Sequence, residues 1–328
     1  MQKIYDVYAI GNALVDTEVE VSDALLAQLG VEKGLMTLVD EARQAEISAG
    51  LDKAPANRAA GGSACNTLVA VCHFGGTGFY SCKVADDDDG AFFVADLADA
   101  GAATNMQAPL PAGTTGKCLV LITPDAERSM NTFLGISADI AISETDENAL
   151  AQSRYLYLEG YLASSETGRA AARHLHDKAR ELGVKTALTF SDAAMVNFCR
   201  DGLDTMLAGG VDLLFCNEGE ALAYTGCDSL DAALDALKPV AASVIITRSE
   251  KGAWVWDGNT LHDIAAPTIK ALNANGAGDA FAGAYLYAIC QDMDARAAGK
   301  LATRTASQVV AQFGPRLTRA QHQQLLQG

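Results

Sequence analysis

Apolar runs of two kinds follow one another along the chain. Short runs at 5–11, 155–161 and 185–191 have the length of buried strands, and the segments between them have the spacing of helices. After residue 150 this alternation is regular. Strands that alternate with helices are typical of a mostly parallel sheet covered by helices. The pattern therefore predicts an α/β fold, with closing helices over 276–290 and 294–313.

A different pattern is found nearer the N-terminus. Residues 15–21 alternate strictly between apolar and mostly acidic or polar side chains, which is typical of a half-exposed strand rather than of a central parallel one. Residues 116–123 and 129–133 flank a turn at Pro124-Asp125 and predict a hairpin. These strands could form a small β lid.

Length and composition are those of a globular protein. The chain has 328 residues, of which 49 % are hydrophobic, and this is enough for a sizeable core. The sequence contains no internal repeat and no long linker. We expect one domain over 1–328, with the β lid formed from about 13–40 and 104–135 and inserted in the α/β core.

The net charge of −17 argues against nucleic acid or an anionic membrane as a partner. No apolar run approaches the roughly 20 residues of a membrane span, and the N-terminus lacks the layout of a signal peptide. We therefore expect a cytoplasmic protein. If it binds a phosphate, local groups must do so: backbone N–H groups, a helix N-terminus, a metal ion or a few arginines.

Two common nucleotide-binding motifs fail at particular positions. Residues 113–117 resemble part of a P-loop, but Pro111 and Cys118 stand where that motif needs Gly and Ser or Thr. Residues 276–278 read Gly-Ala-Gly, but Phe281 stands where a dinucleotide-binding motif has its third glycine. A dinucleotide-binding fold is therefore disfavoured.

The stretch Gly276-Ala277-Gly278-Asp279 precedes a predicted helix. Glycines let the backbone approach an anion closely, and first-turn N–H groups and the helix dipole stabilise negative charge. An aspartate there could accept a proton from an alcohol that attacks a phosphoryl group. An ordinary Gly-rich turn capped by Asp279 is an equal alternative from these four residues alone.

Two further clusters of polar residues stand near predicted strand and helix ends. The segment GGSACNT begins at Gly61; Gly62 again exposes backbone, and Asn66 is polar within an apolar stretch. Asn12 and Asp16 follow the first strand, and the carboxylate of Asp16 could bind two adjacent sugar hydroxyls. Taken singly, these residues could equally be a buried amide bonded to backbone and a solvated acid on a lid strand.

Taken together, these segments resemble the ribokinase-like (PfkB-type) carbohydrate and nucleoside kinases over essentially the whole chain. The two signatures are GGSACNT and NGAGDAFAG (275–283), at about the separation found in the family. The family usually has an aspartate and two threonines before GAGD, where this chain has Asn273, Ala274 and Asn275. The resemblance implies a Rossmann-like, mostly parallel central sheet flanked by helices, with a small β-sheet lid.

Within the family, several segments resemble the adenosine kinase branch, namely GNALVD (11–16), KGLMTLVD (33–40), TPDAERSMNTFLG (123–135) and YLEGY (157–161). NANGAGD and GPRLTR (314–319) also resemble inosine-guanosine kinases. Free-sugar kinases share the two main signatures, so the identity of the nucleoside or sugar stays open.

The resemblance implies an ATP-dependent kinase that transfers the γ-phosphate to the 5′-hydroxymethyl group of a ribofuranosyl substrate, with a nucleoside favoured. Asp279 would be the catalytic base, and the amides of Gly276, Ala277 and Gly278 would hold the transferred group. The residues implied for the acceptor are Asn12, Asp16, Gly61, Gly62 and Asn66, with Arg128 as a candidate anion clamp. Those implied for ATP and magnesium are Asn217, Glu220, Thr247, Gly252 and Asn275.

Other interpretations accompany these roles. Glu220 would bind Mg²⁺ partly through water, but Asn217 and Glu220 could also be a helix cap and a first-turn acid. Arg128 could be an exposed turn residue. Activation by K⁺ is doubtful because Asn273 replaces an acid. A homodimer through the lid is expected, and the alternatives to a nucleoside kinase are a ribokinase- or fructokinase-like free-sugar kinase and a non-catalytic nucleoside-binding protein.

Overall fold

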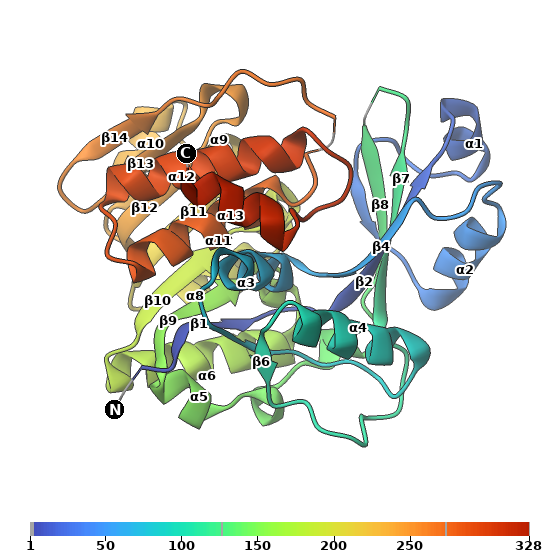
Figure 1. The fold of residues 1–328 in the computed structure, drawn as a ribbon, viewed down its shortest axis with the longest axis horizontal. Coiled ribbons are helices and arrows are strands. Elements are labelled where there is room, and N and C mark those ends of the chain that lie inside the picture. The colour runs from blue at the N-terminus through green and yellow to red at the C-terminus, as the bar shows by residue number, and fades with distance from the viewer. Residues whose placement is uncertain (1–2, 126, 273, 328) are drawn as a thin grey trace.

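The computed structural model describes residues 3–125, 127–272 and 274–327, and it contains a nine-stranded sheet and a five-stranded sheet (Figure 1). In the larger sheet the strands from β12 to β6 run parallel, and β13 and β14 are added antiparallel at one edge. The mostly parallel central sheet predicted from the sequence is confirmed. Its order is β14 (Leu261–Ile264), β13 (Ala253–Trp256), β12 (Ala241–Thr247), β11 (Val211–Asn217), β10 (Lys185–Thr189), β9 (Ser153–Glu159), β1 (Tyr5–Ile10), β5 (Gly78–Ser81) and β6 (Ala103–Thr104).

Helices cover both faces of the larger sheet. Successive strand residues point to opposite sides, and because both sets are apolar, each face needs its own layer of helices. In β1, Val7 and Ala9 join one apolar core, whereas Tyr8 and Ile10 join the other. The first core is closed by α3 (Ser63–Phe74), α4 (Asp88–Asp99), α11 (Ala277–Cys290), α12 (Ala295–Val310) and α13 (Arg319–Gln327). The second is closed by α5 (Glu147–Ala151), α6 (Glu166–Leu182), α7 (Ala193–Phe198), α8 (Arg200–Leu207), α9 (Glu218–Thr225) and α10 (Leu230–Leu237).

The predicted closing helices correspond to α11 and α12. Helix α11 starts one residue later than expected, and α12 ends at Val310 rather than near residue 313. Four short 3₁₀ segments complete the helical elements: η1 (Gly135–Asp139), η2 (Ile142–Glu144), η3 (Gly160–Ser164) and η4 (Ser249–Lys251). No helix in the described part of the chain is both long enough and apolar enough to cross a bilayer.

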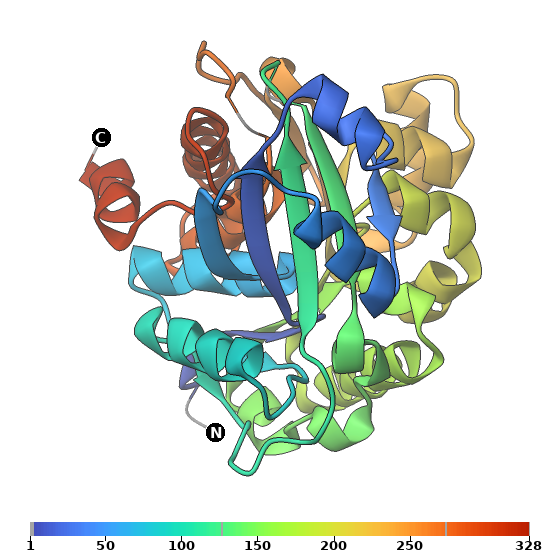
Figure 2. The ribbon, with the colours of Figure 1, turned by 90° about the vertical axis from the view of Figure 1, so that its right-hand side faces the viewer.

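The smaller sheet stands beside the larger one and contains the predicted hairpin (Figures 1 and 2). Helices α1 (Asp23–Gln28) and α2 (Glu41–Ala49) cover its outer face through a cluster that includes Val19, Leu26 and Ile47. Its strand order is β3 (Met36–Leu38), β8 (Arg128–Phe133), β7 (Gly116–Ile122), β2 (Leu14–Glu20) and β4 (Asn57–Gly61).

The smaller sheet differs from the ranges expected for the lid in two places. It includes β4, which lies outside both ranges, and β6 pairs with β5 in the larger sheet. Strand β4 has the sequence NRAAG, without the β-branched or aromatic residues that mark a strand, so its place comes from pairing with β2.

The expectation that the acidic face of residues 15–21 is exposed is wrong for Asp16 and Glu18, although Glu20 at the end of the strand is exposed. Strand β2 lies between β7 and β4, and the carboxylates of Asp16 and Glu18 are only 7 % and 1 % exposed. Residues 14, 16 and 18 share one face of the strand, and Leu14 and Asp16 line the large cleft described below. This strand therefore has a polar face that is turned inward.

Candidate active site

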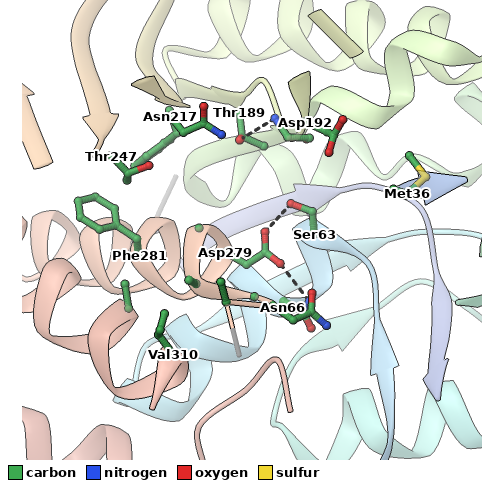
Figure 3. Close-up of a pocket in the computed structure, with 18 of the residues that line it drawn as sticks. Met36, Ser63, Asn66, Thr189, Asp192, Asn217, Thr247, Asp279, Phe281 and Val310 are labelled. Atoms are coloured by element: carbon green, nitrogen blue, oxygen red, sulfur yellow. Dashed lines mark hydrogen bonds between the residues drawn. The ribbon is translucent and has the colours of Figure 1, made fainter. Parts of the chain in front are cut away.

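A cleft of about 1000 Å³ lies between the larger sheet and the inner face of the smaller one. The residues that follow or end five parallel strands line it, namely Asn12, Glu159, Thr189, Asn217 and Thr247. Ligands of open α/β sheets bind outside the carboxyl ends of the strands, so this is the expected position for a ligand site. Figure 3 shows Asp279 on one side of the cleft, with Asn66 and Ser63 on either side of it. Asn217 and Thr247 lie across the cleft from Asp279 in the same view.

The N-terminus of α11 opens into this cleft. Gly276 precedes the helix with φ of 72°, and a Cβ at this position would lie 2.2 Å from the carbonyl oxygen of Pro315, so a larger residue would not fit. Gly278 differs, because a Cβ there would meet no atom within 4 Å. Gly276, Ala277 and Gly278 line the cleft, so the first turn, which is the positive end of the helix dipole, borders the space in which an anion could bind.

Asp279 lies in the first turn of α11 and is held by two side chains from α3. Ser63 Oγ donates to Oδ1 at 2.6 Å, and Asn66 Nδ2 donates to Oδ2 at 3.0 Å (Figure 3). Burial raises the pKa of Asp279 to about 6, while these two bonds and the charge of Arg316 oppose that rise. A carboxylate with this pKa is ionised at neutral pH and is close to the optimum for a general base.

The side chain of Asp16 lies against the backbone of Gly61, where β4 ends and α3 is about to begin. A Cβ on Gly61 would lie 2.2 Å from the carboxylate of Asp16, and one on Gly62 would lie 2.1 Å from the carbonyl oxygen of Asn12. Both glycines are therefore required for β2 and α3 to approach one another. Burial raises the pKa of Asp16 to about 7; Arg316 lowers it, and the charges of Glu18 and Asp279 raise it.

Glu159 is a buried acid on the same side of the cleft. It accepts hydrogen bonds from the amides of Asn12 at 3.2 Å and Ala64 at 2.7 Å, which tie the end of β1 to the start of α3. Burial raises the pKa of Glu159 to about 8, against the effect of those two amides. The cleft wall thus combines acids and amides that match hydroxyl groups.

Asn217 and Glu220 form a reciprocal cap at the start of α9. The amide of Glu220 donates to Asn217 Oδ1 at 2.8 Å, and the amide of Asn217 donates to Glu220 Oε2 at 3.0 Å. The plain interpretation as a helix cap is therefore correct, and both side chains also line the cleft. Burial raises the pKa of Glu220 to about 7, the amide of Asn217 opposes this, and Asp192 adds to it.

The structure gathers nearly all the residues predicted for the site. Gly61 supports the wall without lining it, Arg128 is half-buried at the start of β8 rather than exposed in a turn, and Asn273 lies outside the described residues. The predicted residues that line the cleft are Asn12, Asp16, Gly62, Asn66, Arg128, Asn217, Glu220, Thr247, Gly252, Asn275, Gly276, Ala277, Gly278 and Asp279.

Sequence reasoning missed several polar residues of the site, among them Ser63, Glu159, Thr189, Asp192 and Arg316. Ser63 lies within the GGSACNT signature and Glu159 within YLEGY, so their positions next to recognised motifs were an available signal. Arg316 lies in the GPRLTR segment but reaches α3 from the far end of the chain.

Comparison with known proteins gives a consistent result. The sequence profile of the pfkB family carbohydrate kinases matches residues 46–321. The crystal structure of adenosine kinase from Sinorhizobium meliloti superposes with a TM-score of 0.91 at 32 % identity, over 98 % of this chain and 99 % of that one. Adenosine kinase of Saccharomyces cerevisiae is 26 % identical over 93 % of this chain and 95 % of its own length. Fructokinase-1 of Oryza sativa is 24 % identical over 74 % of this chain and 77 % of its own length.

Proposed function

Because this chain belongs to the pfkB family of carbohydrate kinases, we propose that it transfers the γ-phosphate of ATP to the 5′-hydroxymethyl group of a nucleoside. The observation that carries the proposal is the first turn of α11. There, an aspartate with a pKa of about 6 stands beside the first-turn residues Gly276, Ala277 and Gly278, which line the cleft. A base and an anion site side by side are what transfer of a phosphoryl group to an alcohol requires.

In the proposed reaction, Asp279 accepts the proton of the 5′-hydroxyl as its oxygen forms a bond to the γ-phosphorus. The bond between that phosphorus and the β–γ bridging oxygen breaks, and ADP leaves with the bridging oxygen. Ser63 and Asn66 hold the carboxylate at the mouth of the helix. The first-turn amides of α11 stabilise the charge on the transferred group, which they do better in a cleft with little water.

The other half of the cleft suits the nucleotide. Asn217, Thr247, Gly252 and Asn275 line it, and Glu220 lies within it. Magnesium fits this donor set, because carboxylate oxygens are among its preferred ligands and because it keeps waters and phosphates as its other ligands. When bound, it would neutralise charge on the phosphates. Glu220, with Asp192 close by, would hold it partly through water.

The acceptor side favours a nucleoside over a free sugar. Asn12, Asp16, Gly62 and Asn66 offer polar partners for ribose hydroxyls. Beyond Asp16 the inner face of the smaller sheet is mostly apolar. Cys118 pairs with Asp16, Met130 and Met36 pair with one another, and Thr132 is the polar residue between Cys118 on β7 and Leu38 on β3. A planar base can cover such a surface, whereas a hydroxylated hexose would leave polar groups against it. Arg128, on the same face, would act as a second anion clamp.

The test is transfer of labelled phosphate from ATP to adenosine, inosine, guanosine, ribose and fructose, each in parallel. Transfer to at least one nucleoside, with higher kcat/KM than to either sugar, is the expected result. Transfer to fructose or ribose alone would instead support a free-sugar kinase, the second candidate that the fructokinase relative favours. No transfer with tight nucleoside binding would support a non-catalytic binding protein.

The smaller sheet is proposed to act as a lid and, in a homodimer, as the contact between subunits. Its two outer strands, β3 and β4, each have one edge that pairs with no other strand in the described residues. Such edges are available for pairing with another chain. Sedimentation measurements across a range of protein concentrations would test the dimer, and a monomer at every concentration would reject it.

A further inference from the structure

A buried arginine at the end of the chain is connected to the proposed base through one amide. Arg316 lies in the loop between α12 and α13 with its side chain 13 % exposed. Its Nε donates to Asn66 Oδ1 at 2.7 Å, and Asn66 Nδ2 in turn donates to Asp279 Oδ2 at 3.0 Å. The chain of contacts therefore runs from Arg316 through Asn66 to Asp279.

The orientation of the Asn66 amide follows from this arrangement. An arginine has donors and no acceptor, so it must face the oxygen of the amide and not its nitrogen. The NH₂ group is then directed at Asp279 and donates to the carboxylate. An asparagine without such a neighbour can turn its amide by 180°, which would place oxygen against a carboxylate.

Two further contacts fix the arginine itself. Nη1 donates to Asp96 Oδ2 of α4 at 2.7 Å, and Nη2 contacts Cys65 Sγ of α3 at 3.2 Å. A guanidinium can hold three partners in a fixed plane, which a lysine ammonium on a flexible stem does not. Its positive charge also acts on Asp279 and on Asp16, and it lowers the pKa of both carboxyls.

We propose that Arg316 is a positioning residue for phosphoryl transfer, which orients the Asn66 amide toward Asp279 and keeps that carboxylate ionised. This inference rests on the proposed role of Asp279 as the base. Arg316 itself would not contact the reacting atoms.

Arg319 provides a matched control. It also comes from the C-terminal segment, and it donates to the carbonyl oxygens of Cys72 and Ala100, at 3.2 and 2.9 Å. It therefore attaches the same segment to α3 and to the end of α4 without a contact to Asn66. A role for Arg316 that consisted only of fastening the C-terminal segment would be shared by Arg319.

The experiment compares Arg316→Met, Arg316→Lys and Arg319→Met by the pH dependence of kcat/KM and by melting temperature. We expect Arg316→Met to move the acid limb to higher pH by about one unit, which is a loss of about tenfold at a fixed pH on that limb. Arg316→Lys should keep the limb near its original pH but lower kcat, with the KM for ATP unchanged. Arg319→Met should change neither the pH of the acid limb nor kcat, even if its melting temperature falls.

Other titrating groups face Asp279, so the shift has to be assigned to it. They are Asp16 from β2, Glu159 from β9, and the hydroxyls of Tyr157 and Tyr161, whose pKa values burial raises well above the usual range. The pKa values of Asp16 and Glu159 are raised to about 7 and about 8, which is within the same pH range. A ¹³C titration of side-chain carboxyls in the ligand-free protein, with the Asp279 signal assigned through Asp279→Asn, separates them.

The titration also keeps this inference separate from the proposed function, because it requires no turnover. An upward shift of the Asp279 signal in Arg316→Met, absent in Arg319→Met, supports the inference even if no nucleoside is phosphorylated. An unshifted signal, or equal shifts in both variants, overturns it. If Arg316→Met does not fold, Arg316→Lys with the parent's kcat overturns it, and a lowered kcat with an unchanged KM for ATP supports it.

Discussion

Substituting Gly278 by alanine should separate stability from activity at the N-terminus of α11. The added Cβ would meet no atom of the protein within 4 Å, and φ at this helical position is not in the left-handed region. A glycine replaced by alanine without strain in a helix typically gains about 0.4–1 kcal/mol. For a chain of 328 residues the entropy of unfolding is near 0.7 kcal/mol/K, so the melting temperature should rise by about 1 °C.

The same methyl group should reduce activity strongly. It occupies the space in which the amides of the first turn face the transferred phosphoryl group. Loss of one donor to a developing anion costs about 10²–10³ in kcat, so we expect a fall of that order in kcat. The measurements are scanning calorimetry of the ligand-free protein and phosphate transfer at saturating acceptor.

Gly276→Ala is the contrasting variant, because its Cβ would lie 2.2 Å from a backbone oxygen and φ is 72°. It should lose both stability and activity. An active Gly278→Ala protein would refute anion binding at this turn. A melting temperature lowered by several degrees would refute the conclusion that the space beside Gly278 is empty.

Four further outcomes are expected. Asp279→Asn should lower turnover about 10²–10⁴-fold with acceptor binding retained. In the parent protein, kcat/KM measured from initial rates should fall tenfold for each pH unit below pH 6, as Asp279 becomes protonated. Because the folded-state pKa of Asp279 is raised from 3.8 to about 6, the unfolded carboxyl ionises at lower pH than the folded one; stability therefore falls as pH rises from about 4 to about 6 and stays lowered above that. Asp279→Asn should therefore also melt higher than the parent at pH 8 but not at pH 4. Asp16→Asn should raise the acceptor KM about 10–100-fold with the ATP KM unchanged, since hydrogen bonds to a charged group contribute about 1.5–3 kcal/mol. Removing magnesium with a chelator should abolish transfer. Glu220→Gln should raise the magnesium concentration needed for half-maximal rate, and an unchanged concentration would contradict the proposal that Glu220 holds the ion. Potassium should increase the rate little, because Asn273 replaces the usual acid, and a large increase would show this wrong.

The hydrophobic pattern predicted the larger sheet well because its strands and helices each carry a complete local signal. Helix α6 is an example, since Ser165 accepts from the amide of Gly168 at its start and Gly183 ends it with φ of 66°. Strand β4 carries no such signal. Its small residues allow β2 to approach, and only the pairing of the two strands makes it visible.

The inward position of the acids on β2 could not be read from the strand alone. Alternation shows that two faces differ, but it does not show what lies opposite each face. Here a polar face covers a ligand cleft, and Glu18 lies close enough to Arg128 for its charge to oppose the effect of burial on that arginine's pKa. Arg316 was missed for a related reason, since it contacts Asn66 across 250 positions of sequence from an irregular loop.

The acids of the cleft also bear on how product leaves. Asp16, Glu159 and Asp279 stand together on the acceptor side, and their pKa values of about 7, 8 and 6 show that burial makes each charge costly. A neutral alcohol can bond to them in either protonation state. In the proposed reaction, a phosphorylated product would instead place about two negative charges beside Asp279, which is ionised at neutral pH, and like charges in a cleft of low dielectric repel strongly. In the proposed reaction, the amides of α11 would stabilise the phosphoryl group during transfer, while the Asp279 carboxylate would oppose its retention once ADP has left. If this half of the cleft binds the acceptor as proposed, it would bind a neutral alcohol more readily than its phosphate ester, in a protein whose net charge of −17 already disfavours anions.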